Sequence, residues 1–237
     1  MLYIVGTPIG NLGDVTLRAL EVLKSVDFVL AEDTRVTKKL LDKYNIKIPL
    51  ISYHEHSKNS REEEILKLLQ NGKNLALVTD AGTPGIADPG NRLIEKIYTE
   101  SSRGETSGDS PRSLLGTNIV PIPGASSLTS ILSVCGFPTD QFLFLGFLPK
   151  KKGRQTLLQS LKKENRTIIF FESPHRIVKT LKELENFLGD REAVVGRELT
   201  KIFEEIKRGT LSELSEYFGK KKQKGEFVVA INKKLRK

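Results

Sequence analysis

Acidic residues stand directly after a run of apolar residues in the middle of the chain. The run LALVT at 75–79 predicts a buried strand. The loop that follows it, at 80–90, holds Asp80 and Asp88 among three glycines and two prolines. Glycine lets a ligand approach the backbone without a Cβ in the way, and open α/β sheets bind ligands beyond the carboxyl ends of their strands. The segment therefore predicts a binding loop, with an ordinary solvated turn as the alternative.

A second group of charged residues lies in the AEDTR segment, at the end of another predicted strand. Glu32 and Asp33 are carboxylates that can act as general bases, and Arg35 can orient a phosphate or a ribose. The alternative is structural, because Asp33 or Thr34 can cap a helix whose solvated first turn contains Arg35. The residues alone favour neither interpretation.

Two more glycine-bearing turns follow predicted strands. GTPIGNLGD at 6–14 has neither the dinucleotide nor the Walker glycine spacing, and no lysine follows it, so a nucleoside triphosphate site is unsupported. PIPGASS places the small residues Ser126 and Ser127 at the start of a predicted helix. Free amides at a helix start suit a carboxylate or hydroxyl ligand, although small residues also permit tight helix packing.

The positive charge of the chain is concentrated in its second half. Residues 119–237 carry 23 Lys and Arg against 13 Asp and Glu, whereas residues 1–118 carry 15 against 16. This asymmetry favours a polyanionic partner such as nucleic acid over lysines kept for solubility. The densest basic cluster is Lys150, Lys151 and Lys152 with Arg154.

Metal and disulfide chemistry find little support in the composition. The chain has one cysteine and three histidines, so a disulfide framework is excluded and a structural zinc site is not expected. His54 and His56 could ligate a metal, but no further ligand set stands near them, which favours a solvated loop or RNA contacts.

Strand and helix patterns alternate twice along the chain and predict two α/β domains meeting at a cleft, 1–117 and 118–237. Residues 99–117 are rich in Ser, Thr, Gly and charge, and predict a mobile surface insertion. We expect a cytoplasmic protein without a membrane segment, because no apolar run approaches a bilayer span and the first residues lack a basic signal-peptide region.

Nine motifs, in one order over nearly the whole chain, resemble a known family. They are GTPIGNLGDVTLRAL, AEDTR, HEH, TDAGTPGIADPG, PIPGASS, GFPTDQFLFLGFLP, FFESPHR, RELTKIFEE and KGEFVVAI. The first domain resembles the tetrapyrrole methylase superfamily, and the chain is similar to the 16S rRNA (cytidine-2′-O)-methyltransferase family within it. The resemblance implies a homodimer, with S-adenosyl-L-methionine folded between the two domains. It also implies methyl transfer, without a metal, to the ribose 2′-oxygen of a decoding-centre cytidine in the small ribosomal subunit.

The resemblance also assigns residues. The cofactor contacts it implies are Pro8, Ile9, Gly82, Thr83, Ile86, Ser126, Ser127 and Phe171, and we expect Asp80 or Asp88 to line the same pocket. The charged residues themselves, and not the resemblance, give the catalytic candidates Glu32, Asp33 and Arg35 and the predicted RNA contacts His54, Lys150, Lys151, Lys152, Arg154 and Arg197. Thr83 stands where many tetrapyrrole enzymes have aspartate, which favours the rRNA branch. A methyltransferase of tetrapyrrole or diphthine, and a non-catalytic RNA-binding assembly protein, are the alternatives.

Overall fold

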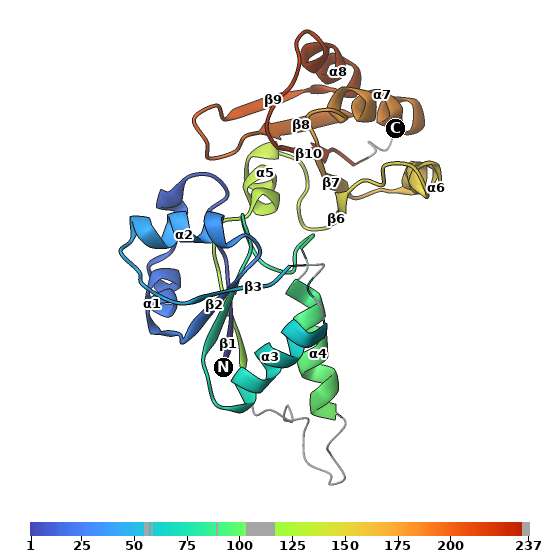
Figure 1. Cartoon of the computed structure of the whole chain (residues 1–237). Helices are drawn as coiled ribbons and strands as arrows, with labels where there is room; N and C mark the ends of the chain where they lie inside the picture. The colour runs from blue at the N-terminus through green and yellow to red at the C-terminus, as the bar shows by residue number, and fades with distance from the viewer. Residues whose placement is uncertain (55–56, 58, 89, 103–116, 234–237) are drawn as a thin grey trace. The chain divides into compact units, whose positions relative to one another are not determined.

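The computed structural model describes residues 1–54, 57, 59–88, 90–102 and 117–233 (Figure 1). The chain divides into two compact units, Met1–Ser126 and Ser127–Lys237, each with its own five-stranded sheet. The prediction of two α/β domains is confirmed. The division falls later than the predicted 117/118 because strand β5 (Ile119–Ile122) completes the first sheet.

All strand pairs of the first sheet are parallel. The strand order is β3 (Leu50–Ser52), β2 (Phe28–Ala31), β4 (Leu75–Val78), β1 (Leu2–Val5) and β5. Such strands are apolar on both sides because helices cover both faces of the sheet. Their carboxyl ends therefore lie along one edge.

Two helices pack on each face of this sheet. Leu75 and Leu77 pack in a cluster with residues of α3 (Asn59–Gln70) and α4 (Gly90–Ser102). Ala76 and Val78 point the other way, into a cluster with α1 (Leu17–Ser25) and α2 (Thr34–Lys43). A short 3₁₀ helix, η1 (Leu12–Asp14), precedes α1.

Helix α4 runs through part of the predicted insertion. The insertion was predicted to begin at residue 99, whereas the helix continues to Ser102. Thr117, at the other end of the predicted insertion, is buried. The residues between them, 103–116, lie outside the described part of the chain.

The sheet order creates a topological switch point between β1 and β4. The chain leaves β1 toward β2 on one side, and leaves β4 toward β5 on the other. Connections that depart in opposite directions from adjacent strands leave a crevice at the carboxyl edge, where open α/β sheets bind ligands. The loops after β1 and β4 flank that position.

The second sheet is mixed. Its order is β6 (Phe142–Phe147), β7 (Thr167–Glu172), β10 (Phe227–Ile231), β8 (Glu192–Arg197) and β9 (Glu205–Thr210). Only β6 and β7 run parallel among its described pairs, whereas the prediction was a second strand–helix alternation. The difference arises because β8 turns directly into β9 without a helix between them.

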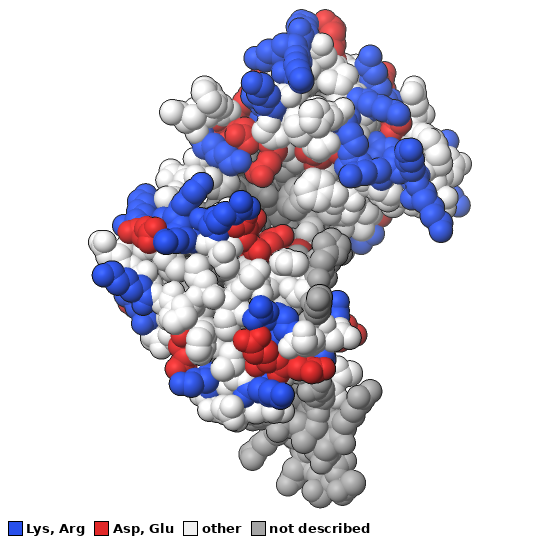
Figure 2. Space-filling view, in the orientation of Figure 1, with Lys and Arg blue, Asp and Glu red and all other residues white. Residues whose placement is uncertain are grey.

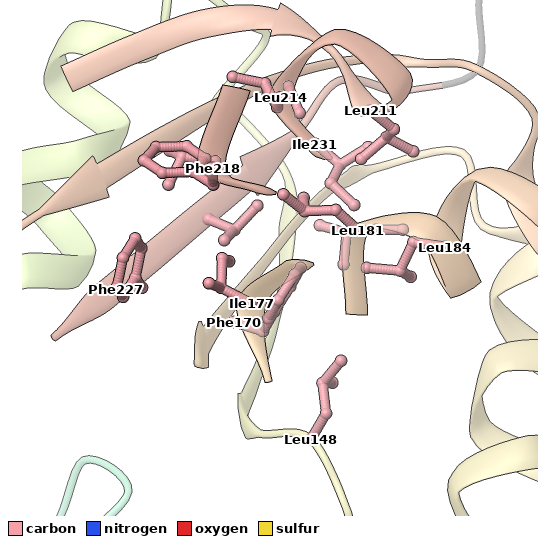
Figure 3. Packing of buried hydrophobic residues seen from close by; sticks show 14 of the residues in the cluster. Leu148, Phe170, Ile177, Leu181, Leu184, Leu211, Leu214, Phe218, Phe227 and Ile231 are labelled. Atoms are coloured by element: carbon pink, nitrogen blue, oxygen red, sulfur yellow. The ribbon is translucent and has the colours of Figure 1, made fainter. Parts of the chain in front are cut away.

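The core of the second unit lies between this sheet and three helices. Figure 3 shows Phe170 of β7 and Phe227 of β10 packed with Leu181 of α7 (Ile177–Leu188) and Phe218 of α8 (Leu211–Gly219). Helix α6 (Arg154–Ser160) adds Leu158 to the same cluster.

The opposite face of this sheet receives α5 (Ser127–Cys135). A Cβ at Gly196 of β8 would lie 3.0 Å from Ile131 Cδ1 of α5, so the glycine permits this close packing. No helix of the described residues is long and apolar enough to cross a membrane.

Candidate active site at the carboxyl edge of the first sheet

The loops after β1 and β4 are joined by backbone hydrogen bonds at the switch point. Thr7 N donates to Gly82 O at 2.9 Å, and Gly82 N donates to Thr7 O at 3.1 Å. The Thr7 hydroxyl also donates to Thr79 O at 3.1 Å. Gly82 has φ of +86°, a left-handed conformation that favours glycine. The two predicted loops therefore form one fixed structure.

The loop after β5 packs against the loop after β1 at a pair of glycines, Gly124 and Gly6. A Cβ at Gly124 would lie 2.6 Å from Gly6 O, closer than real Cβ atoms approach. A Cβ at Gly82 would lie 3.5 Å from Ile9 Cγ2 and 3.7 Å from Ala125 O. Ile9, Gly82 and Ala125 thus line one small region, which places residues of three predicted loops together.

Replacing Gly124 by alanine is expected to destabilise the first unit by about 1–3 kcal/mol, because two backbone segments must separate to admit the methyl group. Chemical denaturation of the full chain measures this change. Gly219→Ala is the control, since its added Cβ would lie 3.8 Å from Val178 Cγ1, an ordinary contact. A Gly124→Ala protein as stable as the control variant would contradict the assigned close contact.

Carboxylates in the segments that follow β2 and β4 lie close together. Glu32 Oε2 accepts a hydrogen bond from the Thr79 hydroxyl at 2.8 Å, and Asp88 Oδ2 contacts the same hydroxyl. Asp33 N donates to Asp80 Oδ1 at 3.0 Å. The two acidic stretches are more than forty residues apart in the sequence, and they are neighbours because parallel strands bring their carboxyl ends to one edge of the sheet.

Burial and the closeness of several carboxylates raise the pKa of two members of this cluster, Asp80 and Asp88. Burial raises the pKa of Asp88, and the charge of Glu32 raises it further. The Thr79 hydroxyl has one proton to donate, so when it donates to Glu32 its contact with Asp88 is a hydrogen bond only if Asp88 carries a proton. Burial also raises the pKa of Asp80, with the charges of Glu32, Asp33 and Asp88 adding to the effect.

Asp80→Asn is expected to flatten the pH dependence of stability of the first unit. The folded protein holds the Asp80 proton more tightly than the unfolded chain, so its stability falls as pH rises from about 4, the ordinary aspartate pKa, through the raised pKa. Asparagine keeps the acceptor for Asp33 N but has no such titration.

Hydrogen exchange of the β1 and β4 amides at several pH values measures the free energy of unfolding of the first unit. Asp42→Asn, which removes an exposed aspartate of α2, is the control for loss of one negative charge. A pH dependence in Asp80→Asn that matches the unchanged protein would contradict the assignment.

Asp33 differs from its neighbours, because its carboxylate caps α2. It accepts hydrogen bonds from Arg35 N at 2.8 Å and from Arg35 Nη2 at 2.6 Å. Hydrogen bonds from the Arg35 side chain and backbone hold the pKa of Asp33 at about 2. The structural interpretation of Asp33 is therefore correct for its contacts, and so weak a base is poorly suited to proton removal.

The other predicted cofactor contacts divide between the units. Pro8 is buried, Thr83 is half-buried and Ile86 is 48% exposed, all in loops of the first unit, and Ser126 is its last residue. Ser127 begins α5 of the second unit. The approach of Ser127 and of Phe171 to the first-unit loops stays a prediction.

Phe171 lies on β7 among other aromatic side chains. Its ring centroid lies 5.1 Å from that of Phe144 and 5.5 Å from that of Phe147, in edge-to-face contacts. Phe147 is 59% exposed, so the group forms an accessible aromatic surface of the second unit.

The structure corrects two predicted RNA contacts. Arg154 is buried, and its guanidinium pairs with Glu183 at 2.6 Å. Arg197 pairs with Glu205 at 3.1 Å and donates to Lys224 O at 2.9 Å. Both guanidinium groups are used inside the unit, so direct contact with RNA is not supported for either.

The remaining predicted RNA contacts are accessible. Lys150, Lys151 and Lys152 are exposed, and so is His54 in the loop after β3. His56 lies outside the described residues. In the part of the chain that the structure describes, no group of three or more His, Cys, Asp and Glu side chains could hold a metal ion.

Sequence comparison places the chain among known proteins. The profile of the tetrapyrrole (corrin/porphyrin) methylases matches residues 1–215. A Thermotoga maritima protein named ribosomal RNA small subunit methyltransferase I is 49% identical over 233 residues, which covers 98% of each chain. The Bacillus subtilis protein of the same name is 46% identical over 232 residues, covering 98% of this chain and 74% of the relative.

Solved structures share the fold at low sequence identity. The methyltransferase CobJ aligns with a TM-score of 0.68 at 16% identity, covering 98% of this chain and 93% of that one. A uroporphyrin-III C-methyltransferase from Thermus thermophilus, complexed with S-adenosyl homocysteine, aligns with a TM-score of 0.63 at 18% identity, covering 98% and 96%.

Proposed function

Because the chain belongs to the tetrapyrrole methylase family, and within it to the family named ribosomal RNA small subunit methyltransferase I, we propose that it methylates 16S rRNA. The methyl group would pass from S-adenosylmethionine to the ribose 2′-oxygen of a decoding-centre cytidine. The observation that carries the proposal is the joined pair of glycine-bearing loops at the β1–β4 switch point, in a chain 49% identical to a protein of that name.

The loops fit an adenosyl ligand. Because Gly82 has no side chain, the space between its backbone, Ile9 and Ala125 is not filled by one. Ile86, which is 48% exposed, offers apolar surface to a base, with the buried Ile9 as a further contact that we propose, and the carboxylates of Glu32 and Asp80 suit hydroxyl or ammonium groups. Pro8, Thr83, Ser126, Ser127 and Phe171 are the further contacts that we propose. When bound, S-adenosylmethionine supplies an electrophilic methyl group on its sulfonium.

The residues of the chain have two tasks in this reaction. They must align the ribose 2′-oxygen with the methyl carbon, since a well-oriented pair of reactants gains most of the available rate. They must also accept the proton that the 2′-hydroxyl loses as the new carbon–oxygen bond forms. Glu32 is our preferred base, because the Asp33 carboxylate already accepts hydrogen bonds from the Arg35 side chain. Arg35 is 87% exposed and can still reach a phosphate.

We further propose a cytoplasmic homodimer with its cofactor held in a cleft between the two domains. Support for a second copy comes from the turn between β8 and β9, where Ile202 is 91% exposed and Phe203 is 71% exposed. Large apolar side chains that are exposed next to one another are typical of protein interfaces. Analytical ultracentrifugation of the full chain tests the dimer.

Ribose-methylation mapping of 16S rRNA tests the proposed function. Small ribosomal subunits from cells without this protein are incubated with the purified chain and labelled S-adenosylmethionine. One new ribose methyl at a decoding-centre cytidine is the expected result. Label that enters a porphyrinoid but not rRNA would assign a tetrapyrrole methyltransferase, and subunit binding without cofactor affinity would assign an assembly protein.

A further inference from the structure

Positive charge is unbalanced along one segment of the second unit. Residues 141–163 contain six Lys and Arg side chains and no Asp or Glu. The segment covers β6, the loop before α6, α6 itself and the 3₁₀ helix η2 (Leu161–Lys163). Lys and Arg atoms gather over α6 and α7 in Figure 2, with few acidic atoms between them.

The loop at the centre of this segment carries Lys150, Lys151 and Lys152, which are exposed. Within the described residues, none of the three makes an ion pair with a carboxylate within 4.0 Å. This tri-lysine loop, 149–153, therefore presents three unneutralised charges to solvent. Three adjacent unneutralised charges attract an anionic partner more strongly than a single exposed lysine does.

Two arginine side chains donate hydrogen bonds to the backbone at the start of the tri-lysine loop. Arg176 Nη1 donates to Leu148 O at 3.0 Å, and Arg154 Nη1 donates to Pro149 O at 3.0 Å. Arg154 N also donates to Lys151 O at 3.2 Å, which closes the loop. Successive carbonyls are thus fixed before the lysines begin.

A buried polar network fixes those arginines in turn. Arg154 Nη2 donates to the Thr180 hydroxyl at 2.8 Å, which donates to Glu172 Oε2 at 2.7 Å. Arg176 pairs with Glu172 Oε1 at 2.6 Å, and Arg154 pairs with Glu183. The charges of both arginines are balanced inside the unit, whereas those of the lysines are not.

We propose that the tri-lysine loop is a preorganised site for the backbone phosphates of RNA, and that Arg154 is a positioning residue for it. The identity of the partner as RNA rests on the proposed function. Lysines bind phosphate as point charges, and a loop already held in one conformation loses little entropy on binding. Arg154 acts through the Pro149 carbonyl and does not touch the nucleic acid.

The salt dependence of binding tests the loop. A 16S rRNA transcript is titrated with the full chain at several KCl concentrations. Replacing all three lysines by alanine is expected to reduce the slope of log K against log[salt] by about 2, since each lost phosphate contact on a single strand contributes about 0.7. The control replaces Lys220, Lys221 and Lys222, which removes the same charge from the turn after α8.

An equal slope in both triple variants, or no change in the loop variant, would overturn the loop assignment. Methyl incorporation by the unchanged protein is measured in parallel. If that protein binds RNA with the expected slopes but transfers no methyl, the proposed function fails and the loop assignment stands. If it methylates rRNA while the loop variant binds unchanged, only the loop assignment fails.

A double-mutant cycle tests the positioning role of Arg154. Arg154→Lys keeps the charge but loses the fork that reaches Glu183 and Pro149 together. We expect it to weaken RNA binding several-fold in the unchanged protein, to have no effect when the three lysines are alanine, and to leave cofactor affinity unaltered.

An equal loss of RNA affinity in both backgrounds would overturn the positioning role. Thr180→Val provides a second variant if Arg154→Lys does not fold. It preserves the side-chain shape and removes the hydroxyl that joins Arg154 to Glu172. The same dependence on the three lysines is expected for it.

Discussion

Glu32→Gln is expected to lower kcat for rRNA methylation by about 100-fold to 10,000-fold, the usual contribution of a general base. Glutamine has the shape of glutamate and can still accept the Thr79 hydroxyl hydrogen bond. It cannot accept a proton from the 2′-hydroxyl. The affinity for S-adenosylmethionine, measured by calorimetry, is expected to stay within about tenfold if the loops after β1 and β4 keep their structure.

Asp33→Asn is the matched control for this prediction. Asparagine is as good a helix cap as aspartate, so α2 should keep its start. Because the pKa of Asp33 is about 2, loss of its basicity should change kcat less than tenfold. A larger loss in Asp33→Asn than in Glu32→Gln would move the proton-accepting role to Asp33, and full activity of Glu32→Gln would remove Glu32 from the reaction.

The first sheet could be predicted from sequence because its strands are buried on both faces. A buried parallel strand is a short apolar run, so 2–5 and 75–79 were identifiable without any contact information. Parallel strands also bring their carboxyl ends to one edge. That rule explains why AEDTR and the 80–90 loop are neighbours, as the Asp33–Asp80 hydrogen bond shows, although this contact was not predicted.

Contacts between distant loops could not be predicted in the same way. The Gly6–Gly124 approach joins residues more than a hundred positions apart, and neither local sequence requires a glycine for its own turn. The Thr79 hydroxyl was also missed, because a threonine at a strand end looks like ordinary strand composition. Only the positions of Glu32 and Asp88 on either side give it a role.

Arg154 was misassigned although the sequence held a signal of its burial. Arg154, Leu157, Leu158 and Leu161 follow the i, i+3, i+4, i+7 spacing of one helix face. Leu158 and Leu161 belong to the core cluster, so Arg154 on the same face turns inward. Its place beside three lysines suggested a surface role, whereas helix periodicity indicated the buried one.

Arg197 offered a similar signal, in the period of a strand. Ala193 and Val195 of β8 both face the core, and Arg197 is the next residue on that side. Its side chain is accordingly only 17% exposed, and its guanidinium is paired with Glu205. A charged residue that follows buried residues on the same side of a strand is therefore expected to form an ion pair inside the protein.

Glu172→Ala is expected to destabilise the second unit by about 3–5 kcal/mol, the usual cost of removing one partner of a buried ion pair. The Glu172 side chain is fully buried and accepts hydrogen bonds from Ser173 N at 2.7 Å and from the Thr180 hydroxyl at 2.7 Å. Its removal leaves the Arg176 guanidinium without its 2.6 Å partner in a poorly solvated position.

Hydrogen exchange of the β7 and β10 amides in the full chain measures this loss, because those strands lie at the centre of the core. Glu172→Gln should lose less, since its amide can still accept hydrogen bonds. Glu216→Ala is the surface control: its 3.5 Å pair with Lys220 is exposed, and its loss should cost less than about 1 kcal/mol. Equal effects of Glu172→Ala and Glu216→Ala would show that the buried network does not hold the unit, and the fixed tri-lysine loop would then lose its physical basis.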